Sequence, residues 1–423
     1  MLPSSTQTPY RQSIEDHLVL RIAADKQDVE RVAAFNGTIH GPLVASMTRN
    51  LFTHHPHTRA EDLIFVEDEE SGQIVSSLCL MPWTWRYEDV DIPAGEMGIV
   101  GTLEAYRRRG LIRAQVGLFK RRLRERGCLL SQIQGIPYYY RQFGYEYALP
   151  LEGGLRLETR HVPDPPDTPF TFRRATFDDL FALMKCYDEA AQDLAIHAVR
   201  DEATWRYLLT HADGTEMERD TWIVQDADGQ VTGYFCVPRH HFGEELVVSE
   251  VSCLGFDMAL VALNHLKALT LEREKPGIRL NLPALCTLMR LARALGAHDL
   301  GTYAWQIHVP DVAALLRALA PVLDRRIAGS PFAGLTRDVR LSLYREVILL
   351  RFETGRLAEV VSQSPAGQEG IRFPPLPFIP LIMGHRTWEE LVAVYPDVHV
   401  APMSRLLIDA LFPRTTAFIY TIY

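Results

Sequence analysis

The stretch from Glu96 to Tyr147 constrains the fold of this chain most strongly, because regular elements flank a turn that is rich in arginine. Ile99, Val100 and Leu103 fit a buried strand, and Gly110 permits a sharp turn or the close approach of a ligand. A helix after the turn is predicted by apolar residues that recur four, three and four positions apart, namely Ile112, Val116, Phe119 and Leu123. The apolar run 128–133 then predicts a second strand.

The turn itself has the composition of an anion-binding site. Arg107, Arg108 and Arg109 directly precede the predicted helix start, where backbone N–H groups lack helical partners and the helix dipole is positive. Three cations there oppose the dipole unless a negative ligand is present. The pattern therefore favours a phosphate-binding turn over a solvated cluster of charges.

Two motifs in this stretch resemble signatures of the GNAT acyltransferases. Arg107-x-x-Gly110 matches the arginine-x-x-glycine-x-glycine/alanine loop that grips the pyrophosphate of coenzyme A, although Ile112 stands where glycine or alanine is usual. The run RRRGL is closer to one branch, the enhanced-intracellular-survival (Eis) aminoglycoside acetyltransferases. Residues 139–145, YYRQFGY, resemble the second GNAT signature and also its Eis form, with Glu146 where glycine is common.

The resemblance implies a mixed α+β fold of tandem GNAT-like domains followed by a sterol-carrier-protein-like domain. We expect a catalytic GNAT domain in residues 1–160 and a degenerate GNAT-like domain in 170–300, beyond the proline-rich linker 162–169. The second domain has no arginine turn before its long helix, so it is expected to be a scaffold. Residues 301–423 would form the third domain, a name that periodicity alone does not supply.

The resemblance also implies roles for particular residues. Tyr140 would be the general acid toward the coenzyme A sulfur, and the terminal carboxylate of Tyr423 the general base. Tyr138 and Tyr139 fit core packing better. Backbone groups on the strand would hold the pantetheine and the thioester oxygen, from Ile99, Val100 and Gly101. Residues of the turn and the helix start would hold the phosphates, namely Arg107, Arg108, Gly110 and Leu111.

The last segment, LFPRTTAFIYTIY, is apolar and aromatic up to Tyr423, whereas an ordinary tail is polar. Leu411-Phe412-Pro413 matches the start of the segment that returns to the first domain in Eis-like enzymes. Two interpretations remain open: the tail reaches the active site, or it packs within its own domain.

Three further residues are candidates for the amine pocket. Trp83 and Trp85 lie two positions apart and share a strand face, and the region of His40 belongs with them. Glu96 occupies the strand position from which many GNAT enzymes supply a base. It could also be an ordinary charge at a strand edge.

Composition limits the partners. The formal net charge of -9 argues against a nucleic-acid binder and favours cationic small molecules. No cysteine pair has ligand spacing, and Pro56 interrupts the segment HHPH at 54–57, which we interpret as a solvated loop and not a metal site. The N-terminus has no apolar signal core and no apolar stretch is long enough for a span, so we expect a cytoplasmic protein without a membrane partner.

The sequence thus predicts an acetyl-CoA-dependent N-acetyltransferase, without a metal, that acts on primary amines of aminoglycoside-like or other polycationic small molecules. Two alternatives remain: a protein or peptide lysine acetyltransferase, and a lipid- or ligand-binding protein whose acyltransferase domain is inactive. Eis relatives assemble as trimers and hexamers, so the resemblance implies a homo-oligomer.

Overall fold

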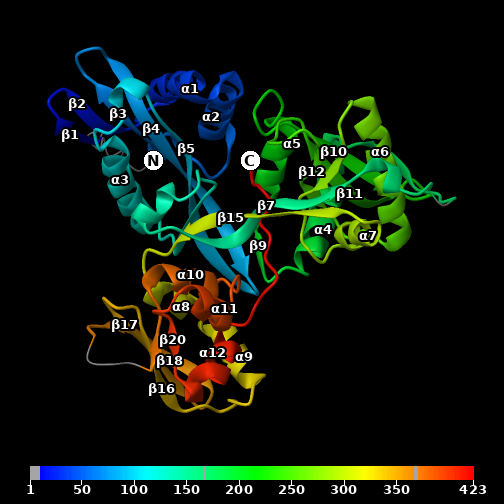
Figure 1. The fold of residues 1–423 in the computed structure, drawn as a ribbon. Coiled ribbons are helices and arrows are strands. Elements are labelled where there is room, and N and C mark those ends of the chain that lie inside the picture. Colours follow the sequence, from blue (N-terminus) through cyan, green and yellow to red (C-terminus); the bar gives the residue numbers. More distant parts are fainter. Residues whose placement is uncertain (1–9, 166, 366–369) are drawn as a thin grey trace, which may run out of the picture.

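The computed structural model describes residues 10–165, 167–365 and 370–423, which form three lobes (Figure 1). The fold is a mixture of α and β structure, as predicted. The N-terminal lobe shares a sheet with the second lobe, and the C-terminal tail runs from the third lobe back to the other two. Within the described residues, no helix is both long and apolar enough to cross a membrane.

The N-terminal lobe contains the strand before the arginine turn, the helix after it and the strand that follows, as the sequence predicts. Its elements are β1 (Arg11–Glu15), β2 (Leu18–Ile22), α1 (Lys26–His40), α2 (Pro42–His54), β3 (Leu63–Asp68), β4 (Gln73–Tyr87), β5 (Val90–Thr102), α3 (Leu111–Glu125) and β6 (Leu130–Ile133). The strands lie in sequence order in one sheet, antiparallel except for the parallel pair β5 and β6. Helices α1 and α2 pack on one face and α3 packs on the other.

Local sequence explains where several helices begin. Asp25, Asp201 and Asp311 each accept a hydrogen bond from the backbone N–H three residues later, at the starts of α1, α5 (Glu202–Thr210) and α8 (Val312–Ala318). As expected from the Gly-Pro pair, Pro42 occupies the first turn of α2.

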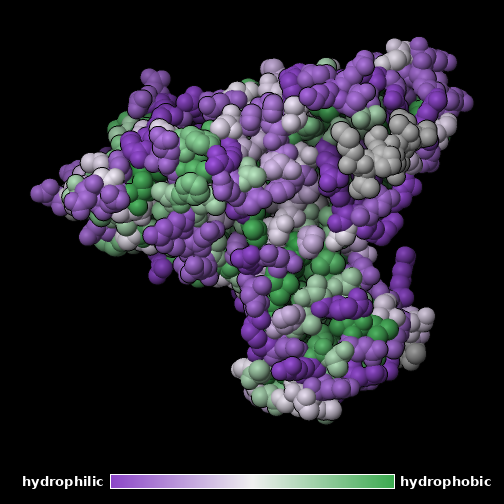
Figure 2. Space-filling model, turned by 180° about the vertical axis from the view of Figure 1, so that it is seen from behind, coloured by the Kyte–Doolittle hydropathy of each residue, from purple (hydrophilic) through white to green (hydrophobic). Residues whose placement is uncertain are grey.

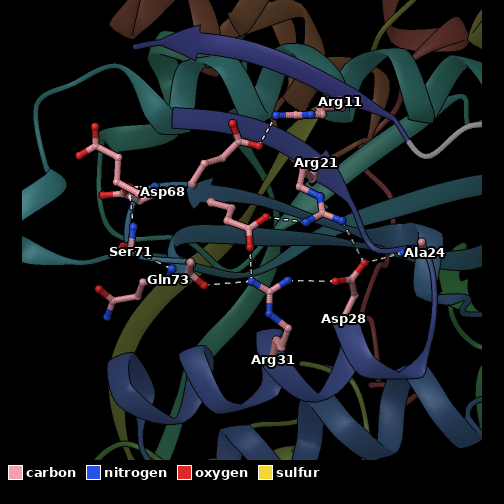
Figure 3. Close-up of polar contacts among 12 residues, drawn as sticks. Arg11, Arg21, Ala24, Asp28, Arg31, Asp68, Ser71 and Gln73 are labelled. Carbon is pink, nitrogen blue, oxygen red and sulfur yellow. Dashed lines mark hydrogen bonds and ion pairs between the residues drawn. The ribbon is translucent and has the colours of Figure 1, made fainter. Parts of the chain in front are cut away.

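Ion pairs fasten the outer edge of this lobe (Figure 3). Arg21 and Arg31 both contact Glu67 on β3, and both also contact Asp28 in the first turn of α1. Because each carboxylate faces two guanidinium groups, α1 is tied to the sheet at its beginning.

The second lobe is built around a separate sheet. Four strands lie in the order β13-β11-β10-β8, namely β8 (Thr171–Arg174), β10 (Arg219–Gln225), β11 (Val231–Pro238) and β13 (Glu250–Val251). The lobe also contains α5 and three further helices, α4 (Leu180–Ala191), α6 (Phe256–Glu272) and α7 (Thr287–Ala294).

The first sheet continues into the second lobe, which the predicted boundaries do not anticipate. Strand β15 (His298–His308) lies between β6 and β7 (Glu146–Leu157), antiparallel to both. Beyond β7 the sheet adds β14 (Ile278–Leu280) and β12 (Leu246–Val248), and β9 (Ile196–Ala198) pairs with β4. The boundary predicted at residues 300 and 301 therefore falls inside β15, because pairing between strands distant in sequence leaves no break in the local pattern.

The third lobe follows β15. Its sheet has the order β18-β17-β16-β19-β20, formed by β16 (Arg337–Ser342), β17 (Val347–Glu353), β18 (Arg356–Gln363), β19 (Ile371–Arg372) and β20 (His399–Val400). Its helices are α8, α9 (Ala320–Ala328), α10 (Pro375–Ile382), α11 (Trp388–Val394) and α12 (Arg405–Leu411). Arg326 contacts Glu88, and the Tyr87 hydroxyl donates to the Ile382 carbonyl at 2.7 Å, so this lobe is docked on the end of β4.

The tail leaves the third lobe after Pro413 and returns to the other two (Figure 1). Ala417 forms a parallel bridge with Ile196, and the Phe418 N–H donates to the Ile196 carbonyl at 3.1 Å. Phe418, Tyr420 and Ile422 are buried. The tail does not pack within its own lobe, which excludes one of the two interpretations of its sequence.

Candidate active site

The site begins where β5 and β6 separate. They pair only between 94–96 and 130–132, whereas β5 continues along β4 to Thr102. Cys79 pairs with Gly98 and Ser77 with Gly101, so Ile99 and Val100 oppose the single residue Leu78. This is a β-bulge, and it places Ile99 at φ 50°, a strained value for a β-branched residue. Such strain occurs mainly at functional sites. The three predicted backbone positions, Ile99, Val100 and Gly101, therefore lie on a strand edge that β6 leaves free.

The arginine turn leads from this edge to α3. Gly110 precedes the helix at φ 78°, a left-handed conformation that favours glycine, and no side chain caps the helix start. The backbone N–H groups of the first turn, beginning at Leu111, are thus open to a ligand. Arg108 is itself left-handed at φ 65°.

The three arginines are not equivalent. Arg107 and Arg108 are exposed, and neither forms an ion pair with another described residue. Arg109 contacts Glu15 on β1 at 3.0 Å and lies over the Tyr106 ring at 5.5 Å. Arg109 therefore anchors the turn, and the other two are free to hold an anion.

Tyr140 lies beyond the end of β6 in the short helix η3 (Tyr139–Phe143). It is buried among Tyr139, Phe143 and Tyr145, and burial raises its pKa. A Cβ at Gly135 would lie 2.3 Å from its ring, so the glycine makes room for this tyrosine. Tyr138 is 72% exposed, which contradicts core packing at that position.

Glu96 and Tyr423 meet on the opposite side of the sheet. The Tyr423 hydroxyl donates to Glu96 Oε1 at 3.0 Å, and the Tyr423 ring stands edge-on to Trp83 at 6.1 Å. Glu96 is 2% exposed, so it is not a solubilising charge. Burial raises the pKa of its carboxyl group to about 8, although the Tyr423 hydroxyl and the Trp83 indole lower it in part.

Several polar atoms around Glu96 have no partner. Among the described residues, none forms a hydrogen bond with Glu96 Oε2, with the carboxamide of Gln132 or with the indole N–H of Trp305. Gln132 lies beside Glu96 in the sheet, and Trp305 stands edge-on to Trp83 at 6.2 Å. Because buried polar groups normally have partners, this cluster fits a polar ligand such as an amine.

Two carbonyl groups fix the end of the tail to the rest of the molecule. Arg200 Nε donates to the Thr421 carbonyl at 2.9 Å, while the rest of its guanidinium holds Glu250 at 2.6 and 2.7 Å. His55 Nε2 lies 3.2 Å from the Ile422 carbonyl. Within the tail, the Thr421 hydroxyl donates to a terminal carboxylate oxygen of Tyr423 at 2.9 Å. Burial lowers the pKa of His55 to about 4, so at neutral pH it is an uncharged donor.

Not every predicted residue belongs to this site. Trp85 is completely buried in the core, where it pairs across the strands with Ile92 and Ala198, and it has no surface for a ligand. The HHPH segment is also not simply a solvated loop, because His55 is buried against the tail. The described residues contain no group of three potential metal ligands.

His40, whose region was a candidate for the amine pocket, lies beside Gly101, and the Glu216 carboxylate of the second lobe is close enough to raise the pKa of His40, against the larger lowering by burial. The structure also adds residues that sequence analysis missed, of which Glu216 is one. Arg200, Glu250, Gln132 and Trp305 carry no motif. The only signal for Arg200 and Glu250 was the presence of charges in otherwise apolar runs.

The two candidate proton-transfer groups therefore lie on different faces of one sheet. Tyr140 packs with Leu111 and Met97 on the α3 face, whereas Trp83 and Tyr423 belong to the core on the face of α1 and α2.

Comparison with known proteins agrees with this geometry. Residues 30–148 match the family described as Acetyltransferase (GNAT) domain. No curated protein sequence matches the chain.

Solved structures resemble the chain over nearly its whole length, at identities that establish the fold alone. A GCN5-related N-acetyltransferase from Anabaena variabilis has a TM-score of 0.71 at 13% identity, over 95% of this chain and 99% of its own. A probable N-acyltransferase from Enterococcus faecalis has a TM-score of 0.71 at 14% sequence identity, and the match covers 96% of this chain and 100% of its own. Eis1 from Mycobacterium abscessus has a TM-score of 0.65 at 16% sequence identity, with the same coverage of 96% and 100%. The chain therefore carries a GNAT acetyltransferase domain, which confirms the enzyme class predicted from the arginine turn and the tyrosine motif.

Proposed function

We propose that the protein transfers an acetyl group from acetyl-CoA to primary amines of polycationic small molecules, of which aminoglycosides are one class. One observation carries this proposal: the free edge of β5 runs from the buried Glu96 carboxylate directly into an open, cationic helix start. An anionic cosubstrate and a cationic acceptor thus have complementary places on one strand.

The residues present fit acetyl-CoA. Arg107, Arg108 and the backbone N–H groups from Gly110 and Leu111 onward would hold its phosphates. The bulged backbone of Ile99, Val100 and Gly101 would hold the pantetheine and the thioester oxygen. Tyr140, whose burial keeps its hydroxyl protonated, would supply a proton to the sulfur.

The amine would enter from the face of α1 and α2. Glu96 Oε2 and the carboxamide oxygen of Gln132 would offer it hydrogen-bond acceptors beside Trp83. The exposed Glu216 carboxylate acts electrostatically on both His40 and Tyr423 and adds negative charge nearby. These groups suit an acceptor with several ammonium groups.

Two groups are candidates for the base, and pH separates them. Glu96, with a pKa of about 8, is mostly protonated at pH 7. If Glu96 is the base, kcat rises with pH up to about 8. If the Tyr423 carboxylate is the base, kcat does not follow this titration.

The test measures loss of thioester absorbance from acetyl-CoA with aminoglycosides, polyamines and a lysine peptide. We expect turnover with the small polycations and little with the peptide. Tyr140→Phe should lower kcat by about 10²-fold and leave the KM for acetyl-CoA within about twofold, since only a proton donor is removed. Tyr139→Phe is the matched control. No turnover with any amine would contradict the proposal, and preference for the peptide would favour a protein acetyltransferase.

We further propose that the third lobe, with its five-stranded sheet, is sterol-carrier-like and that the chain forms a homo-oligomer. Sedimentation of the purified protein tests the second point, and a monomer would contradict it.

A further inference from the structure

A second large cavity lies apart from the candidate active site, where the three lobes meet. Its volume is about 1230 Å³, and none of the residues assigned above to the acetyl-CoA or amine sites lines it. Its walls come from β7, the end of α4, the segment 281–287, α7, residues 383–386 and tail residues 414–420. Ligand pockets in proteins commonly measure roughly 300–1,000 Å³, so this space can hold a sizeable molecule.

The interior of this cavity is mostly apolar. Its lining includes Leu149, Leu254, Met289, Met383 and Phe418. From behind, hydrophobic side chains are visible where the lower lobe joins the body (Figure 2). A molecule bound here would bury an apolar portion against side chains of all three lobes.

Four arginines from two separate parts of the chain contribute positive charge to the lining. On α7, Arg290 and Arg293 are exposed and donate to the carbonyls of Leu285 and Ala284, and neither forms an ion pair with another described residue. Elsewhere in the lining, Arg386 and Arg414 share a single carboxylate, that of Glu390. Burial lowers the pKa of His385 to about 4, so it adds no charge at neutral pH.

Among the lining residues whose side chains the structure describes, Asp193 and Asp299 are acidic, against these four arginines. These described residues therefore carry an excess of positive charge in a protein whose formal net charge is -9. Charge complementarity selects an anionic head group, and the apolar walls select a hydrocarbon chain.

From this combination we propose that the junction cavity binds a single-chain amphiphile with a carboxylate head, a fatty acid in chemical terms, with its chain between the lobes and its head on the α7 arginines. This function is independent of acetyl transfer. Because the tail forms part of the wall before it reaches the active site, the ligand would also brace the tail.

Two cysteines can report whether a ligand occupies the cavity. Of its six cysteines, Cys79, Cys128, Cys186 and Cys236 are buried, while Cys253 is exposed and Cys286 is intermediate. Cys253 and Cys286 both line the cavity. Alkylation of these two thiols should therefore be slowed by a ligand in this cavity.

The experiment uses the full chain with dodecanoate and, as the neutral analogue, dodecan-1-ol, both below their aggregation limits. Binding is followed by calorimetry, and alkylation of Cys253 and Cys286 by mass spectrometry. We expect saturable dodecanoate binding, at least about tenfold tighter than the alcohol, with protection of both cysteines. Saturating acetyl-CoA should leave both results unchanged, which separates this cavity from the active site.

Two variants locate the site. The double variant Arg290→Gln, Arg293→Gln should lower the affinity for dodecanoate about tenfold and leave the affinity for dodecan-1-ol unchanged. Unchanged binding of the alcohol shows that the variant is folded. Arg345→Gln, Arg356→Gln removes the same charge from exposed arginines outside the cavity and should change neither. Ala190→Trp, which fills the cavity wall, should abolish binding of both ligands. Equal affinity for acid and alcohol, absence of thiol protection, or competition by acetyl-CoA would each overturn the proposal.

Discussion

Glu96 is the residue whose environment differs most from its ordinary one. Its carboxyl group lies inside the sheet with one oxygen bonded to Tyr423 and the other without a partner among the described residues. Taking an ionised carboxylate out of water is costly, so burial raises its pKa to about 8. Such a group keeps its proton in the free protein, and an ammonium group bound beside it would favour its ionised form.

This environment predicts a pH-dependent stability. Because the pKa of Glu96 is higher in the folded protein than the ordinary value of 4.5, the folded state binds the proton more tightly. The free energy of unfolding should therefore fall as pH rises from about 4.5 to about 8, by at most about 1.4 kcal/mol per pH unit. Glu96→Gln removes this titration. The free energy of unfolding of the variant, relative to that of the parent at the same pH, should therefore be higher at pH 9 than at pH 5.

Urea unfolding at the two pH values measures this difference. Glu202→Gln, at an exposed ion pair with Arg206, is the matched control and should change little. If the parent and Glu96→Gln lose stability in parallel between pH 5 and 9, Glu96 is not the buried acid described above.

The arginines in the turn between β5 and α3 have two different roles: one holds the turn in place, and two are exposed to a ligand. Arg109 is held by Glu15 and Tyr106, whereas Arg107 and Arg108 are exposed beside a helix start without a side-chain cap. Arg108 and Gly110 are both left-handed. Left-handed residues in a turn can point successive backbone N–H groups toward one anion, which a regular helix start does not do.

Removing the exposed cations should weaken the binding of acetyl-CoA and have little effect on the chemical step. We expect Arg107→Ala and Arg108→Gly each to raise the KM for acetyl-CoA about tenfold with little change in kcat, because each loses a charge-assisted contact to phosphate. Glycine at 108 also keeps the left-handed backbone. Arg124→Ala, which removes an exposed charge from the last turn of α3, is the comparison and should leave this KM within about twofold. Steady-state kinetics would contradict the assignment if Arg124→Ala had the larger effect.

In the whole molecule, one buried ion pair connects the second lobe to the active site. Arg200 and Glu250 hold each other with 0% and 2% side-chain exposure, and the remaining donors of Arg200 bind the Thr421 carbonyl. Tyr187 and Trp205 place their rings 4.4 and 4.9 Å from the guanidinium carbon. The position of Tyr423 thus depends on a lobe that has no arginine turn of its own.

Breaking this link should loosen the tail. Arg200→Met leaves Glu250 in its ion pair with Arg219 and in its hydrogen bond with the Tyr234 hydroxyl, so the variant avoids an unpaired buried charge, which would cost about 3–5 kcal/mol. We expect faster proteolysis within the tail and at least about tenfold lower kcat, with acetyl-CoA affinity within about twofold. Arg206→Met, at an exposed ion pair, is the control. A tail that remains protected in the first variant would refute the role of this ion pair.

The strand, arginine turn, helix and tyrosine motif of the N-terminal lobe were readable from residue order, because Gly110, Arg107 and the apolar period of α3 act over a few neighbouring positions. The family resemblance extended this to the direction of the tail. Its bond from Tyr423 to Glu96 joins positions 327 residues apart, and that from Arg200 to Thr421 joins positions 221 apart. The insertion of β15 between β6 and β7, the burial of Trp85 and the cavity between the lobes likewise arise from packing between distant segments. Hydrophobic periodicity records which side of an element is buried, but not which distant element buries it.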